Sequence, residues 1–93
     1  MAEEQLSPEE FLKQLKVSDL MLGTLASLVQ LGYAKLDEDS EQTRLAIEVL
    51  RAVLPVLEGA APEDAVRDLR QATANLQLAY ASKINAPATE EET

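Results

Sequence analysis

Apolar residues recur along most of this chain at intervals of three and four positions, which is the period of an amphipathic helix. The pattern predicts helices over residues 8–16, 19–33, 41–58 and 62–84. The predicted fold is therefore all-α, a small three-helix unit preceded by a short extra N-terminal helix. Residues 7–84 form its single domain, and the acidic segments 1–6 and 85–93 are predicted to be disordered.

The first helix has a clear start signal. Ser7 suits the N-cap, Pro8 suits the first helical position, and Glu10 completes a capping box. Ser18 is a second N-cap candidate, which predicts a bend between the short helix and the next one. A single continuous helix over residues 8–33 is the alternative.

Residues 20–34, LMLGTLASLVQLGYA, contain no charged side chain, and their apolar residues cover most of the circumference of a helix. Gly23 and Ser27 form a patch of small residues where another backbone could approach closely. Gly32, followed by Tyr33, is predicted to end the helix. The segment would span about 22 Å, which is short of the ~30 Å hydrocarbon core of a bilayer. A buried helix is therefore predicted, with no membrane span.

The helix over residues 41–58 has one narrow polar stripe and is apolar elsewhere. The stripe consists of Glu41, Arg44, Glu48, Arg51, Pro55 and Glu58. Pro55 lacks the N–H that would bond back to Arg51, which predicts a kink or a restart there, and Gly59 is predicted to stop the helix. By contrast, residues 62–84 have a narrow heptad-like seam and a broad polar face, typical of an ordinary surface helix whose first position is Pro62.

Two helices with such wide apolar arcs need more neighbours than one small chain provides. We therefore expect a homodimer with a helical-bundle core, formed through these two helices. The predicted interface residues are Leu22, Leu25, Val29, Leu50, Val53 and Leu57. The alternative is an adaptor whose apolar groove binds an amphipathic helix of another protein.

The net charge of −9 comes mostly from the two ends of the chain. No basic footprint for DNA or RNA is present, so a nucleic-acid partner is not predicted. The first ten residues are acidic where a secretory signal would be basic. A cytoplasmic location is therefore expected.

The residues that carry most enzyme chemistry are missing from this sequence. It contains no cysteine and no histidine, which excludes disulfides, thiolate metal sites and the commonest general base. The stretch from Asp37 to Glu48 resembles the register of a calcium loop, but Gln42 stands where that loop needs glycine. No catalytic residue, metal or cofactor is predicted. A small enzyme or ligand carrier would have to use carboxylates, lysines, Tyr33 or Tyr80.

Three stretches of the chain carry a family resemblance: LASLVQLGYAKL, TRLAIEVLRAVLPVLEG and DLRQATANLQLAYA. Their order is similar to that of the bacterial domain-of-unknown-function family 1844, over about Val17 to Ala81. The shared features are Leu31-Gly32, the Leu45-Ala46-Ile47 start and Tyr80. The segment GAAPEDA departs from the basic, polar break of that family. The resemblance implies a helical fold and assigns no site.

Overall fold

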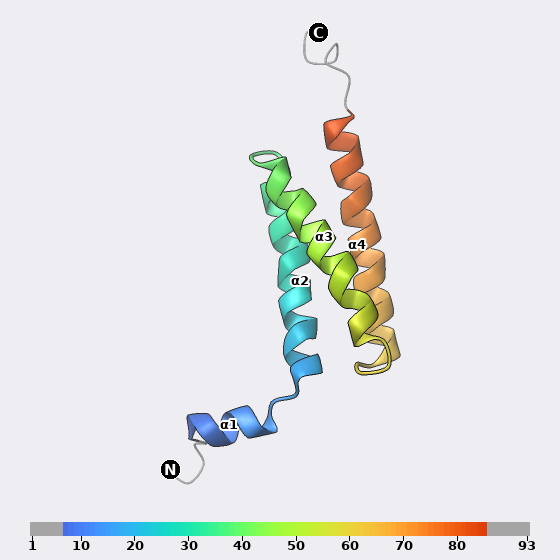
Figure 1. Ribbon diagram of the computed structural model, residues 1–93. Helices are drawn as coiled ribbons and strands as arrows, with labels where there is room; N and C mark the ends of the chain where they lie inside the picture. The colour runs from blue at the N-terminus through green and yellow to red at the C-terminus, as the bar shows by residue number, and fades with distance from the viewer. Residues whose placement is uncertain (1–6, 86–93) are drawn as a thin grey trace.

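The computed structural model describes residues 7–85, which form four helices (Figure 1). The helices are α1 (Pro8–Gln14), α2 (Val17–Lys35), α3 (Ser40–Leu57) and α4 (Glu63–Ile84). The prediction of an all-α fold is confirmed. The predictions for residues 1–6 and 86–93 lie outside the described part of the chain.

Helices α2, α3 and α4 pack against one another and make the body of the molecule. The helix α3 runs antiparallel to both neighbours, so α2 and α4 run in the same direction (Figure 1). The core between them is almost wholly aliphatic. Its buried apolar residues are Leu25, Val29, Ala46, Ile47, Leu50, Leu54, Leu57, Val66, Leu69 and Leu76.

The N-terminal helix starts as predicted and ends earlier. Ser7 Oγ accepts a hydrogen bond from the Glu10 N–H at 3.1 Å, and the Glu10 carboxylate accepts one from the Ser7 N–H at 3.3 Å. Leu15 and Lys16 then adopt extended backbone angles, which separate α1 from α2. The predicted bend is confirmed, and the continuous helix is wrong. Ser18 is not the N-cap, because the extended backbone ends at Lys16 and α2 begins at Val17.

The prediction that Gly32 ends the second helix is wrong. The helix α2 continues to Lys35, and Gly32 lies buried within it. A Cβ atom at Gly32 would lie only 2.7 Å from Leu76 Cδ2. The glycine is therefore needed for the close approach of α4, and not for a left-handed cap. Its carbonyl accepts a hydrogen bond of 2.7 Å from the buried Thr43 hydroxyl of α3.

The proline in α3 does not restart the helix. Pro55 lies in the last turn, and α3 continues through it to Leu57. Only two helical residues follow the missing hydrogen bond, so little of the helix depends on it. Gly59 has a φ of 85° and ends the element as predicted. Pro62 is the N-cap of α4 and not its first helical residue.

Candidate interaction surface

The six predicted interface residues lie inside the single chain or at the edge of its core. Leu25, Leu50 and Leu57 are almost completely buried, and so is Val29. The other two residues, Leu22 and Val53, are partly buried against the same core. The most regular apolar face of each helix therefore packs against the helix's own neighbours. The four buried side chains are not available to a partner in this fold.

A different set of uncharged residues is exposed on α2 and α3. We call this set the outer face. It consists of Val17, Leu20, Thr24, Ser27 and Leu31 on α2 and of Leu45, Val49, Ala52 and Val56 on α3. Val17 and Val56 are 76% and 72% exposed, and Leu20 and Leu31 are each about half exposed. On both helices the spacing alternates between three and four, so each set forms a stripe along one side of its helix.

On α2, the residues that face α4 fix the direction of the exposed stripe. Leu22 and Ala26 line a groove beside α4. Each lies two positions from an outer-face residue, Leu20 and Thr24 respectively. Two positions correspond to about 200° around a helix. The stripe on α2 therefore faces away from α4.

The stripe on α3 has the same direction. Ile47 and Leu54 line hollows together with residues of α4. Leu45 and Val49 lie two positions to either side of Ile47, and Ala52 and Val56 flank Leu54 in the same way. They too point about 200° away from α4. Because α2 and α3 pack side by side, the two stripes form one surface on the side opposite α4.

One of the two hydroxyl groups on the outer face is already hydrogen-bonded within its own helix. The Thr24 hydroxyl donates a hydrogen bond to the Leu20 carbonyl at 2.9 Å, so it already has a partner inside its own helix. Next to it, Gly23 has no neighbouring atom within 4 Å of a Cβ built on it, which leaves open space beside the stripe. Burying a hydroxyl group that already has a hydrogen-bond partner costs little desolvation free energy.

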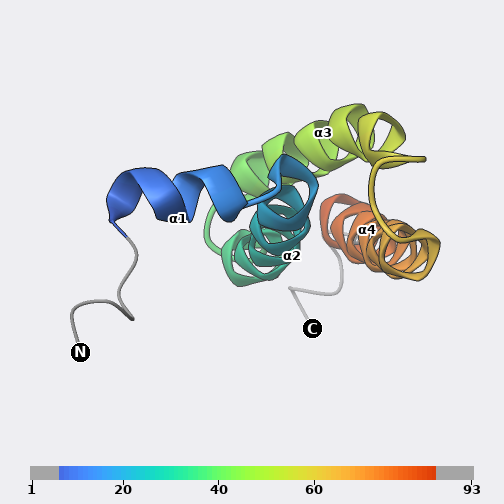
Figure 2. The same ribbon diagram turned by 90° about the horizontal axis from the view of Figure 1, so that it is seen from below.

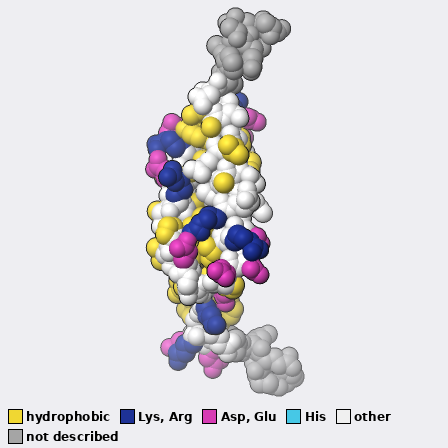
Figure 3. Space-filling view, turned by 90° about the vertical axis from the view of Figure 1, so that its right-hand side faces the viewer, with side chains coloured by type: hydrophobic (Ala, Val, Ile, Leu, Met, Phe, Trp, Pro, Cys, Tyr) yellow, Lys and Arg dark blue, Asp and Glu magenta, His cyan; other side chains and the backbone are white. Residues whose placement is uncertain are grey.

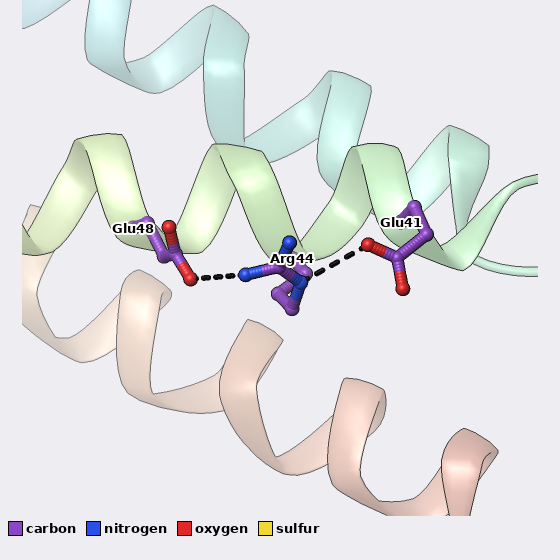
Figure 4. A network of polar contacts seen from close by, with 3 residues as sticks. All are labelled: Glu41, Arg44 and Glu48. Carbon is purple, nitrogen blue, oxygen red and sulfur yellow. Dashed lines mark hydrogen bonds and ion pairs between the residues drawn. The ribbon is translucent and has the colours of Figure 1, made fainter.

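Charged side chains lie along the side of α3 that adjoins the outer face, since Glu41 and Glu48 are four and three positions from Leu45. Arg44 donates hydrogen bonds to Glu41, at 3.1 Å, and to Glu48 (Figure 4). The hydrogen bond to Glu41 raises the pKa of Arg44 above its ordinary value, and the charge of Glu48 adds to the effect. An ion pair also joins Arg70 to Glu58. Figure 3 shows the α4 side of the molecule, where acidic and basic side chains are mixed with apolar ones.

The groove beside α4 and one further hollow are other concave parts of the surface. The groove between α2 and α4 has a volume of about 440 Å³ and is mostly apolar, although Gln30 and Asp68 lie at its edge. A second hollow, of about 430 Å³, lies next to Glu58, Arg67 and Arg70. Within residues 7–85 no group of carboxylates is placed to hold a metal ion. In the same range, no helix combines the length and apolarity needed to cross a bilayer.

Tyr80 lines a hollow whose other described residues carry no charge. The hollow that Tyr80 lines is otherwise formed by Ile47, Ala74, Gln77, Leu78 and Ala81. Tyr33 is about half exposed on α2. The residues proposed for a small enzyme therefore do not come together in this hollow.

Comparisons with family models, curated proteins and solved structures find no match for this chain.

Proposed function

We propose that this chain is a non-enzymatic interaction module that forms a homodimer through its outer face. One observation carries the proposal: two exposed, uncharged and mainly aliphatic stripes on adjacent helices form one surface. Contiguous exposed apolar patches on small proteins mark interaction sites. A second copy is the simplest partner, because two identical faces bury each other in a layered helical bundle.

The dimensions of the outer face support this partner. The 19 residues of α2 span about 28 Å, and two adjacent helices are about 20 Å wide. The resulting footprint of roughly 500–600 Å² is of the same order as the ~800 Å² that each partner contributes to a standard interface. The proposal has two further parts: the chain is related to domain-of-unknown-function family 1844, and it lies in the cytoplasm.

The groove between α2 and α4 supports a second candidate function. Leu22, Val29 and Leu69 form an apolar floor in it, on the side of α2 opposite the outer face. An amphipathic helix of another protein would fit such a groove. As the alternative to a homodimer, the adaptor function predicts a chain that is monomeric by itself. A dimer formed through the outer face supports the first candidate, although it leaves this groove exposed.

Light scattering at micromolar concentration tests the proposed function. We expect a mass near twice 10.1 kDa for the unmodified chain. Leu31→Asp places a charge on the outer face, where Leu31 is 52% exposed, and is expected to give monomers. The matched control is Leu78→Asp, because Leu78 is 68% exposed on α4 and lies off the outer face. This control should remain dimeric.

The result that contradicts the homodimer is a folded, cooperative monomer of the unmodified chain. Equal masses for the Leu31→Asp and Leu78→Asp variants, both dimeric, would instead place the contact elsewhere. Circular dichroism of each variant shows whether its helices have formed.

A further inference from the structure

Helix α1 is amphipathic, yet no other helix within residues 7–85 packs against it. Phe11 and Leu12 are 54% and 65% exposed, and no residue of α1 is buried. Among residues 7–85, α1 contacts none of the other three helices. Helices this short are marginal in water without tertiary packing. Within the part of the chain that the structure describes, its apolar side is therefore uncovered.

The direction of α1 identifies where a partner for its apolar side would lie. The helix turns aside at the lower end of α2 and extends to the side opposite α4 (Figures 1 and 2). The outer face is on that same side. A second copy packed on the outer face would lie directly beside α1.

We propose that α1 is an arm that packs across the end of the second copy, with the two copies antiparallel about a two-fold axis. This inference rests on the proposed homodimer and adds its orientation and a second contact. Phe11 and Leu12 of one copy cover the end of the other copy where its α2 joins its α3. The two arms then hold the dimer at its two opposite ends.

Charge distinguishes the antiparallel arrangement from the parallel one. The exposed loop between α2 and α3 contains Asp37, Glu38 and Asp39, and Asp37 pairs with Lys83 of its own chain at 3.2 Å. Lys16 lies at the opposite end of α2, immediately before its first residue. Lys13 lies with Glu9 and Glu10 on the polar side of α1 and adds no net positive charge there. An antiparallel pair brings Lys16 of each copy to Glu38 and Asp39 of the other. A parallel pair brings the two acidic loops together, which is repulsive.

Engineered cysteines test the orientation, because the native chain contains none. Val17 and Ala34 lie near opposite ends of α2. In an oxidised mixture of Val17→Cys and Ala34→Cys chains, the antiparallel pair gives a disulfide between unlike chains. A disulfide between two Val17→Cys chains is the result of a parallel pair and overturns the inference.

The double variant Phe11→Ser/Leu12→Ser tests the arm. Both side chains lie outside the core, so the body should fold normally. The Kd of the dimer, measured by sedimentation, is expected to rise at least about tenfold, because two large apolar side chains lose their burial. An unchanged Kd overturns the arm. If α1 packed on its own chain instead, the Tm of the monomer would fall while the Kd stayed constant.

A charge exchange adds a specific readout. Lys16→Glu should raise the Kd by about two- to thirtyfold, because the two-fold axis makes one substitution remove two exposed ion pairs. Adding Glu38→Lys to the same chain should restore the original Kd. Failure of this rescue contradicts the pairing of arm and loop. A monomeric unmodified chain contradicts the proposed function itself, whereas a dimer that is insensitive to these arm variants contradicts only the arm.

Discussion

The hydroxyl of Thr43 connects two helices through one buried hydrogen bond. Its acceptor, the Gly32 carbonyl, belongs to the last turn of α2, whose carbonyls have no helical partner further along the chain. The Tyr33 and Lys35 carbonyls of the same turn accept backbone N–H groups of the following loop. Thr43 therefore supplies the donor that the end of α2 lacks.

Thr43→Val is expected to lower the free energy of unfolding by about 1–3 kcal/mol, because it leaves the Gly32 carbonyl buried without this donor. Urea unfolding measures the loss. The matched control is Thr73→Val, at an equally buried threonine. The Thr73 hydroxyl bonds to the Leu69 carbonyl of its own helix, which keeps its backbone partner. Equal losses in the two variants would contradict the role assigned to Thr43.

Which individual residues of α2 are buried and which are exposed could not be predicted from the sequence. Leu25 and Leu31 are the same amino acid on the same uncharged helix, yet one is buried and the other is about half exposed. A helix that is apolar over most of its circumference does not indicate which side its own chain will cover. That choice depends on where α4 packs, which is a property of the whole bundle.

At the scale of elements, the distance between α2 and α4 depends on a missing side chain. Gly32→Ala would place a methyl group 2.7 Å from the fully buried Leu76. The helices must then move apart, and we expect a net loss of about 1–2 kcal/mol in the free energy of unfolding, since overpacking outweighs the gain in helix propensity. Thermal and urea denaturation measure this change.

The control for this variant is Gly23→Ala on the same helix. No atom lies within 4 Å of the added methyl group, so this change should stabilise α2 by about 0.5–1 kcal/mol. The two substitutions should therefore have opposite signs. A stabilised Gly32→Ala variant would mean that Leu76 can move aside at no cost.

Helix starts and ends were predictable where the signal is local. The capping box of Ser7 and Glu10 and the left-handed Gly59 both lie within a few residues of the end they mark. Gly32 misled the prediction because its reason for being glycine is Leu76, which lies 44 positions further along the chain. Ser18 has the side chain of a good cap, but the extended residues before it already let α2 begin at Val17.

At the scale of the whole molecule, dimer formation links stability to concentration. If unfolding separates two copies, a tenfold rise in protein concentration stabilises the dimer by about 1.4 kcal/mol. We therefore expect the Tm of the unmodified chain to rise with concentration in scanning calorimetry. The Leu31→Asp variant should have a lower Tm that does not change with concentration. A concentration-independent Tm for the unmodified chain would contradict a dimer that dissociates on unfolding.

The capping box of α1 has a consequence for the speed and strength of assembly. Two reciprocal hydrogen bonds and Pro8 favour helical backbone angles at residues that contact no other helix. An arm with this bias loses less conformational entropy on docking than an unstructured segment of the same length. A larger fraction of the encounters between two copies then leads to a dimer, because the arm is already helical. The residues from Ser7 to Glu10 would in this way raise the association rate of the dimer. Apart from the ring of Pro8, they add no apolar contact to its interface.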